Sequence, residues 1–126
     1  MLVPYALVCL GLSMPTPPLH RGHSRFFLDT ADSNEWKSLL PLGIFHGITT
    51  NPVLLQRAGV PCTVESCRSL ASQAFALGAD EFMLQAWGEN TAALIASGLA
   101  LSEGNRENLV VKVPVTAAGS ASGDRT

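Results

Sequence analysis

Charged side chains are scarce in this chain of 126 residues, where they make up 14% of the total, against about 25% in ordinary soluble domains. Such a deficit is typical of a chain whose surfaces are meant to be covered by further protein. The formal net charge of −2 offers no electrostatic attraction for nucleic acid or for an anionic membrane surface. We therefore expect neither a nucleic acid nor a membrane as partner.

Cysteines are few, and they are not arranged for chemistry. Cys9, Cys62 and Cys67 have no metal-ligand spacing and include no CxxC motif, so we expect no thiol redox function. This usage fits a reducing compartment and favours a cytoplasmic location.

Long apolar runs are absent as well. Residues 1–13 are apolar but too few to span a bilayer, and the first positively charged side chain is Arg21, so the basic start of a secretory signal is missing. We interpret residues 1–24 as an N-terminal extension that is poorly ordered. The alternative is a weak signal or transit segment, which would imply an organellar location.

From residue 25 onward, short apolar segments alternate with segments of helical pattern, which is typical of parallel βαβ units. Helices are predicted to begin at Asp32 or Ser33, at Thr63, and at Asn90 or Thr91, with a short helical turn after Pro52. The predicted strands are 26–29, 44–50, 81–86 and a fourth from 109 that ends near Pro114. Residues 120–126 are expected to form a disordered tail.

One lysine stands in an otherwise apolar strand, since residues 109–116 read LVVKVPVT. Burial disfavours the ammonium form and lowers the pKa of such a lysine toward neutrality. A neutral amine can attack a ketone and form a Schiff base. The alternative is an edge-strand lysine whose stem packs while its amine reaches water.

Other polar side chains also fall at or near the predicted carboxyl ends of strands. In a parallel barrel these ends converge on one face, where the active site lies. A carboxylate, a hydroxyl, two amides and an amine would meet there, which is a set suited to carbonyl chemistry. The residues are Asp29, Thr49, Asn51, Gln85 and Lys112.

Three segments together resemble the transaldolase and fructose-6-phosphate aldolase family of class I aldolases. They are LDTAD at 28–32, GITTNP at 47–52 and VVKVPVT at 110–116, in the order and at the compact spacing of that family. The resemblance covers residues 26–119. It implies an α/β fold, the (β/α)8 TIM barrel, and an enzyme that cleaves or transfers a dihydroxyacetone unit of a sugar phosphate in the pentose phosphate part of carbohydrate metabolism.

The resemblance also implies a role for each candidate residue. Lys112 would be the Schiff-base nucleophile, and Asp29 would orient substrate hydroxyls and assist proton transfer, with a helix cap as its alternative. Thr49 and Asn51 would contact the substrate and the lysine. The alternative role for these two residues is formation of a turn. Gln85 stands where many transaldolases carry a glutamate and resembles the fructose-6-phosphate aldolase branch, so both transferase and lyase activity stay open.

Neither a cofactor nor a metal is expected, because the imine does the electrophilic work that zinc does in other aldolases. None of the three histidines matches a role in the family, and we interpret His46 as a packed or solvated residue.

A complete barrel of this kind needs about 200 residues or more, whereas this sequence has room for four βα units. We therefore expect residues 25–119 to form the N-terminal half of the barrel. Such a half-barrel would be truncated and inactive alone, and its open sheet edges would favour self-association or a homo-oligomer. The alternative is a non-catalytic fragment that acts as an assembly or binding partner, or a decayed gene product.

Overall fold

The computed structural model describes residues 24–105 and 107–116 of the chain. Apart from Ser24, the predicted N-terminal extension lies outside the described residues, and so does the predicted tail at 120–126. No helix in the described part is long and apolar enough to cross a membrane.

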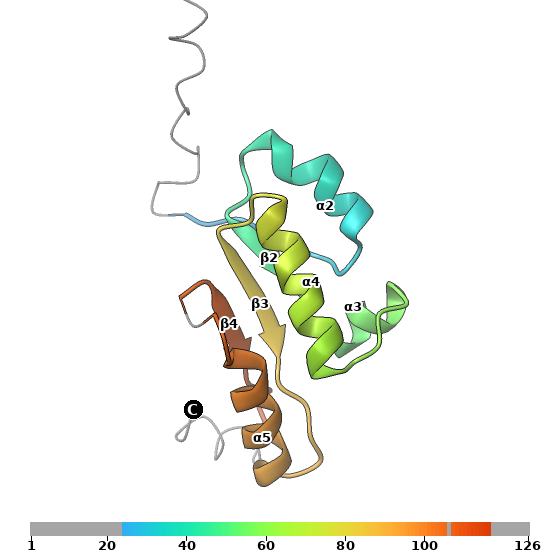
Figure 1. Ribbon diagram of the computed structural model, residues 1–126, viewed down its shortest axis with the longest axis vertical. Coiled ribbons are helices and arrows are strands. Elements are labelled where there is room, and N and C mark those ends of the chain that lie inside the picture. The colour runs from blue at the N-terminus through green and yellow to red at the C-terminus, as the bar shows by residue number, and fades with distance from the viewer. Residues whose placement is uncertain (1–23, 106, 117–126) are drawn as a thin grey trace, which may run out of the picture.

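Four parallel strands form one open sheet in the order β1-β2-β3-β4 (Figure 1). The strands β2, β3 and β4 each pair with the strand that precedes them in the chain. This arrangement is that of consecutive βα units of a TIM barrel, and it confirms the predicted fold class. The strands are β1 (Phe27–Asp29), β2 (Gly47–Thr49), β3 (Glu81–Gln85) and β4 (Leu109–Lys112).

All four strands are shorter than predicted, β1 and β3 by one residue each. β2 begins at Gly47 rather than at residue 44, because the chain has just left the left-handed turn at Gly43, where φ is 72°. β4 ends at Lys112, two residues before Pro114, whose ring nitrogen has no hydrogen to donate to a ladder.

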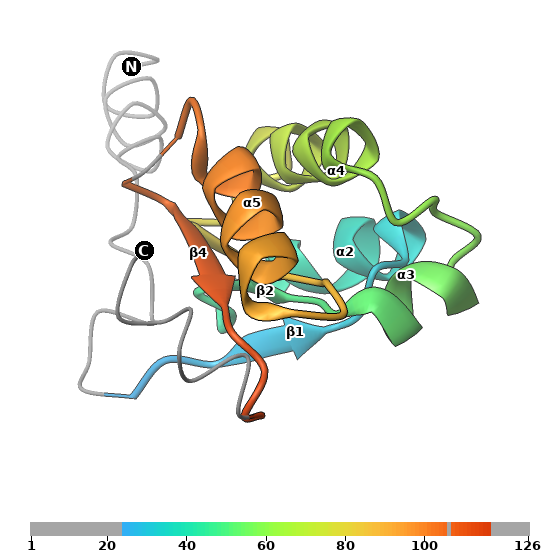
Figure 2. The same ribbon diagram turned by 90° about the horizontal axis from the view of Figure 1, so that it is seen from below.

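Helices cover only one face of the sheet (Figure 2). The helices α2 (Ser33–Leu39), α4 (Val64–Ala76) and α5 (Thr91–Ser102) follow the first three strands. A 3₁₀ turn, η1 (Leu40–Leu42), extends α2, and the short helix α3 (Pro52–Arg57) follows β2 directly. Each α-helix begins where the sequence offers a polar cap, because a side-chain oxygen accepts a hydrogen bond from the backbone N–H two or three residues on. The capping residues are Asp32, Asn51, Thr63 and Asn90.

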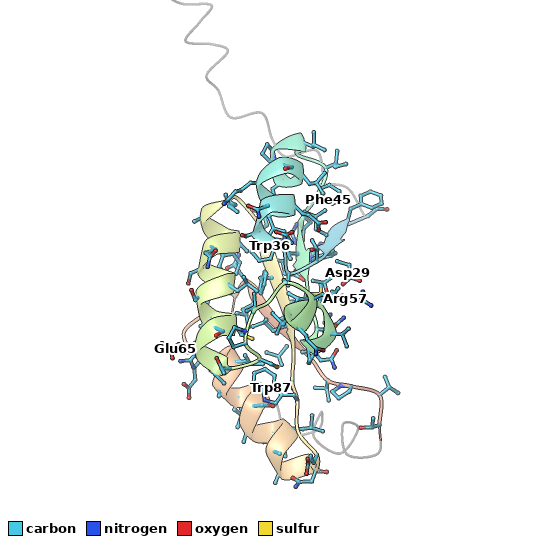
Figure 3. The ribbon with its side chains drawn as sticks, turned by 90° about the vertical axis from the view of Figure 1, so that its right-hand side faces the viewer. Asp29, Trp36, Phe45, Arg57, Glu65 and Trp87 are labelled. Atoms are coloured by element: carbon cyan, nitrogen blue, oxygen red, sulfur yellow. The ribbon has the colours of Figure 1, made fainter. Side chains whose placement is uncertain are left out.

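The core lies between the sheet and these helices. Alternate residues of each strand point to opposite sides, and in β3 Phe82 and Leu84 are buried while the other three residues are half-buried. Phe82 packs edge-on against Trp36 of α2, with ring centroids 5.7 Å apart. Trp36 is wholly inaccessible to solvent and is labelled in Figure 3.

Among the described residues, no helix lies over the opposite side of the sheet, and we call this side the uncovered face. Its members follow from strand pairing and alternation, because paired residues of parallel strands point to the same side. The uncovered face consists of Phe27, Asp29, Gly47, Thr49, Glu81, Met83, Gln85, Val110 and Lys112.

Candidate functional site

Four of the five candidate residues lie on the uncovered face, toward the carboxyl ends of their strands. Asp29 pairs with Thr49 across β1 and β2, and Gln85 pairs with Lys112 across β3 and β4. Thr49 in turn pairs with Met83, two residues before Gln85 on the same side of β3. The parallel topology therefore gathers side chains from four strands at one end of one face.

Lys112 makes a direct contact within this group. Its Nζ donates a hydrogen bond to Thr49 Oγ1 at 2.6 Å, so the side chain reaches from β4 across β3 to β2. The lysine is half-buried, and burial lowers the pKa of its ammonium from the ordinary value of 10.5. The carboxylate of Asp29 acts in the opposite direction and is the smaller of the two influences on this pKa.

Asp29 is exposed and lines a cavity of about 320 Å³ between the end of β1, the start of α2 and α3. The alternative role of helix cap belongs to its neighbour Asp32, whose Oδ1 accepts a hydrogen bond from Asn34 N at 2.8 Å. Arg57 of α3 lines the same cavity and lies close to Asp29 in Figure 3. The sequence did not indicate Arg57 as part of a site, because its nearness to Asp29 depends on how α3 folds over the sheet edge.

Asn51 is placed differently from the other candidates. Its Oδ1 accepts the backbone N–H of Leu54 at 3.0 Å, and Pro52 occupies the first turn of α3. The side-chain oxygen of Asn51 therefore caps α3, as expected from the alternative in which this residue forms a turn. The side-chain Nδ2 makes no hydrogen bond within the described part of the chain and points to no fixed partner there.

Gln85 is half-buried next to Lys112 in the ladder. Among residues 24–105 and 107–116, no hydrogen bond joins Lys112 to Gln85 or to Asp29. Thr49 is thus the hydrogen-bond partner of the amine, and the other two side chains flank the site without a bond to it.

A second polar group lies at the opposite, amino end of the strands, and the sequence did not reveal it. Glu81 Oε2 lies 3.3 Å from Arg25 Nη1 and 3.4 Å from His46 Nε2, while His46 Nδ1 lies 3.7 Å from Asp80 Oδ2. His46 is therefore far along the sheet from Lys112. The alternation of β3, which begins at Glu81, was the signal that could have placed this carboxylate on the uncovered face.

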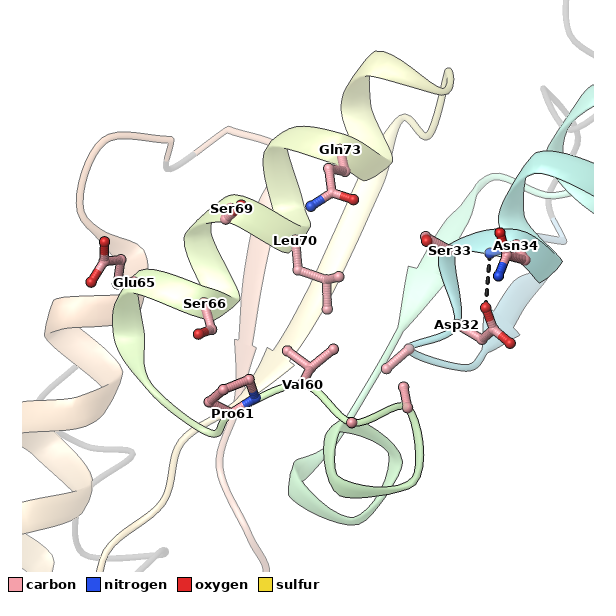
Figure 4. A pocket seen from close by; sticks show the side chains of 13 residues that line it. Asp32, Ser33, Asn34, Val60, Pro61, Glu65, Ser66, Ser69, Leu70 and Gln73 are labelled. Atoms are coloured by element: carbon pink, nitrogen blue, oxygen red, sulfur yellow. Dashed lines mark hydrogen bonds between the residues drawn. The ribbon is translucent and has the colours of Figure 1, made fainter.

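The helix side carries a cavity of about 530 Å³ between the start of α2, the connection from α3 to α4, and α4 itself. Figure 4 shows the polar side chains that line it, among them Ser66, Ser69 and Gln73 of α4. None of the five candidate residues lines this cavity. This cavity is therefore separate from the polar side chains at the strand ends, where the half-buried amine of Lys112 contacts the hydroxyl of Thr49.

The described part of the chain contains no group of three or more histidine, cysteine, aspartate or glutamate side chains that could hold a metal ion. The functional groups at the strand ends are an amine, a hydroxyl, a carboxylate and an amide. Sequential parallel strands with helices on one side, and these groups at the carboxyl edge, are typical of the class of α/β-barrel proteins.

Comparison with known proteins narrows this class to one family. The model of the Transaldolase/Fructose-6-phosphate aldolase family matches residues 26–122, and the chain belongs to this family. Proteins named probable transaldolase are among its relatives. The one from Aquifex aeolicus is 34% identical over 95 residues, which are 75% of this chain and 41% of the relative.

Relatives from other bacteria give the same result. The probable transaldolase of Roseobacter denitrificans is 36% identical over 73% of this chain and 40% of its own length. That of Shouchella clausii is 36% identical over 75% of this chain and 41% of its own length. The chain thus matches about two fifths of the length of these relatives.

Proposed function

We propose that this chain carries the nucleophile-bearing portion of the active site of a Schiff-base aldolase or transaldolase that acts on a sugar phosphate. The observation that carries the proposal is the Lys112 amine, half-buried on the uncovered face and 2.6 Å from Thr49 Oγ1. A lysine whose pKa is lowered by burial has more of the neutral amine that attacks carbonyl groups. Membership of the family supports this reading.

The reaction begins when Lys112 Nζ adds to the carbonyl carbon of a ketose. The resulting carbinolamine takes up a proton and loses water, which leaves a protonated imine. When the bond between C3 and C4 breaks, its electron pair moves toward the imine nitrogen, and the C4 hydroxyl gives up its proton as an aldehyde leaves. The remaining enamine either takes a proton and is hydrolysed to dihydroxyacetone, or adds to a second aldehyde.

Thr49 orients the amine for the first step. When the neutral amine donates one N–H to Thr49 Oγ1, its lone pair stays free to meet the substrate. A fixed direction of attack lowers the entropic cost of reaching a reactive geometry. This role of Thr49 is local to the lysine, whereas Asn51, held as the cap of α3, would contact the substrate through Nδ2.

Asp29 and Gln85 flank the amine with different chemistry. The Asp29 carboxylate can accept the proton of a substrate hydroxyl. Gln85 carries no titratable group, so it can hold a water molecule or a hydroxyl by hydrogen bonds but cannot itself take the proton. We therefore assign proton transfer to Asp29 and positioning to Gln85.

The chain contains only two lysines, Lys37 and Lys112, which gives the test an internal control. Lys37 is exposed near the end of α2. Treatment with dihydroxyacetone and borohydride is expected to reduce an imine onto Lys112 and to leave Lys37 largely unmodified, as read by peptide mass spectrometry. Lys37→Arg should keep the adduct and Lys112→Arg should remove it. An adduct shared equally between the two lysines would contradict the proposal.

Substitution of Thr49 tests the orienting bond. Thr49→Val keeps the shape but removes the acceptor, and a hydrogen bond to an amine of this kind contributes about 1.5 kcal/mol, so adduct formation is expected to slow about tenfold. Thr49→Ser keeps the hydroxyl and should react near the original rate. Equal rates for the valine and serine variants would show that Thr49 has no such role.

A non-catalytic role in assembly is the second candidate function. Within residues 24–105 and 107–116, β1 and β4 each pair on one side only, and this favours an assembly role because open edges pair readily with other chains. A selective borohydride adduct on Lys112 would count against a purely structural role.

A further inference from the structure

The connection from β3 to α5 covers residues 86–90 and starts directly after Gln85. The backbone N–H of Ala86 donates to the backbone oxygen of Lys112 at 2.9 Å, and Gln85 itself pairs with Lys112 in the ladder. A shift of this connection would therefore move the Gln85 amide relative to the Lys112 amine. The groups concerned lie on β3, α5 and β4, which follow one another in the chain.

One side chain of α5 binds this connection at its second residue. Ser97 Oγ accepts a hydrogen bond from Trp87 N at 3.1 Å and donates one to Trp87 O at 2.7 Å. The carbonyl oxygen of Leu94, one turn earlier in α5, lies 3.1 Å from the same hydroxyl, so the hydroxyl has its shorter contact with Trp87. Both polar backbone groups of Trp87 are thus bound by Ser97, and Trp87 lies beside α5 in Figure 3.

Ser97 differs in this respect from other serines of the long helices. Ser72 of α4 donates to Arg68 O, and Ser102 of α5 donates to Leu99 O, so each binds a carbonyl of its own helix. A serine inside a helix commonly makes such a bond, and the bond restrains no loop. Ser97 is half-buried and reaches a residue ten positions earlier. Ser102 therefore offers a matched control within the same helix.

The connection is also shaped to lie close to α5. A Cβ atom on Gly88 would lie 2.7 Å from both Ala93 Cβ and Leu94 N, so the loop backbone packs directly on the first turn of the helix. Asn90 caps that turn, because its Oδ1 accepts the N–H of Ala93 at 2.9 Å. These contacts fix the end of the loop, and the hydroxyl of Ser97 fixes its start.

A similar arrangement follows β1. The indole N–H of Trp36 on α2 donates to Thr30 O at 3.0 Å, and Thr30 comes directly after Asp29. On β1 and on β3, the next helix therefore binds the backbone one or two residues past a candidate side chain. Such hydrogen bonds from surrounding side chains hold the groups of a site in their working geometry.

We propose that Ser97 is a positioning residue of the site: by binding both backbone groups of Trp87, it holds the Gln85 amide beside the Lys112 amine. The inference rests on the proposed Schiff-base function and adds to it a residue that does not touch the substrate. Without the hydroxyl, Trp87 N and O must bind water instead, and the end of β3 gains freedom. The Gln85 amide then spends less time where it can hold the water or hydroxyl of the reacting carbinolamine.

The rate at which dihydroxyacetone and borohydride label Lys112 tests this role. Ser97→Ala is expected to slow the labelling about tenfold, because two hydrogen bonds that restrain the site are lost. Ser97→Thr keeps the hydroxyl, and Ser102→Ala removes only a bond within the helix, so both should react near the original rate. Equal rates for Ser97→Ala and Ser102→Ala would overturn the proposal.

A double-mutant cycle with Gln85 separates positioning from a general loss of stability. Gln85→Ala removes the amide that Ser97 holds in place, so adding Ser97→Ala to this variant should slow the labelling no further. If the two losses multiply instead, Ser97 does not act through Gln85 and the proposal fails.

Gly88→Ala displaces the same loop by a different cause. Its methyl group would clash with the first turn of α5, so it should also slow the labelling about tenfold. This variant takes the place of Ser97→Ala in the cycle if circular dichroism shows that Ser97→Ala has lost its helices. An unchanged rate for Gly88→Ala would then overturn the proposal.

Amide hydrogen exchange tests the positioning without any chemistry at Lys112. NMR compares two N–H groups near the two ends of β3: that of Ala86, which donates to Lys112 O, and that of Phe82, which donates to Asn108 O. In Ser97→Ala the exchange of Ala86 is expected to quicken about tenfold while that of Phe82 stays unchanged. An equal change at both positions, or none at Ala86, would overturn the proposal. If the unaltered chain forms no adduct, the proposed function fails, and this exchange pattern alone decides whether Ser97 holds the loop.

Discussion

Two influences act in opposite directions on the protonation of Lys112. Burial on the uncovered face lowers the pKa of the ammonium, and the Asp29 carboxylate raises it. Because an unfolded chain holds the lysine near its ordinary pKa of 10.5, the unfolded state binds more protons in the window between the lowered pKa and 10.5. The contribution of Lys112 to the free energy of unfolding therefore rises with pH across that window.

Removal of the Asp29 charge is expected to lower the pKa of Lys112 further. Asp29→Asn takes away the carboxylate that favours the ammonium form, so the neutral amine appears at lower pH. An NMR titration of the two lysines after ¹³C reductive methylation measures each pKa separately, with the exposed Lys37 as internal reference. Glu35→Gln, a change in the same cavity as Asp29, should leave the pKa of Lys112 unmoved. A rise in that pKa on Asp29→Asn would contradict the assignment.

Thr50 offers a prediction about stability. The side chain is wholly buried, and its Oγ1 has no hydrogen-bond partner in the described part of the chain. Thr50→Val replaces the hydroxyl by a methyl group of similar shape, so the free energy of unfolding is expected to rise by about 1 kcal/mol. Thr50→Ser, which keeps the hydroxyl and leaves a small void, should lower it by a similar amount. Thermal unfolding followed by circular dichroism compares the three proteins, and a less stable valine variant would contradict the prediction.

The chemistry of single residues was partly predictable from sequence. A lysine among valines indicated the nucleophile because its apolar neighbours are adjacent in the chain. Its partner could not be predicted, since Thr49 lies 63 positions away and the contact depends on sheet curvature. The missing hydrogen bond of Thr50 could not be predicted either, because strand alternation predicts which side of the sheet a residue faces. It does not predict whether a buried hydroxyl finds a hydrogen-bond partner.

Among the elements, helix starts followed the sequence closely and strand limits did not. The caps at Asp32, Thr63 and Asn90 act on backbone N–H groups two or three residues away, so a local pattern predicts them. A strand extends only as far as its neighbour pairs with it. The apolar run before Gly47 therefore predicted a longer β2 than the ladder with β1 and β3 allows.

The pairing of β2 with β3 depends on the absence of a side chain at Gly47. A Cβ at this position would overlap the backbone carbonyl oxygen of Glu81. Backbone cannot rotate away as a side chain can, so Gly47→Ala is expected to lower the free energy of unfolding by about 3 kcal/mol or more. Gly43→Ala is the matched control: its φ is 72° and the space around it is open, so it should cost only about 1–2 kcal/mol. Urea unfolding of both variants measures the difference, and equal losses would contradict the clash.

At the scale of the whole molecule, the order of strands and the side taken by the helices were predictable, because both follow from the alternation of strands and helices. The cavity on the helix side was not, since its walls come from three separate segments. The same holds for the group around Glu81, which joins residues from the starts of three strands.

The 126-residue chain is expected to bind substrate at Lys112 but to turn it over slowly. The relatives that it matches are more than twice as long as the matched portion, and a poorly positioned substrate costs about a hundredfold in rate. Joining this chain to the remaining part of the Aquifex aeolicus relative should therefore speed fructose 6-phosphate cleavage at least about a hundredfold, measured by release of glyceraldehyde 3-phosphate. Lys112→Arg in the joined protein is the control. Equal rates with and without the added part would contradict the prediction.

The neighbour-by-neighbour order of the sheet also bears on how the protein is made. Ladder partners begin at residues 27 and 47, 47 and 81, and 82 and 109, so β2, β3 and β4 each pair with a strand that the ribosome has already released. Among the described strands, neighbours in the sheet are also neighbours in the chain, and loops of such length close at a modest entropic cost. The sheet can therefore grow one unit at a time from the amino end, with a newly exposed edge at every stage of synthesis.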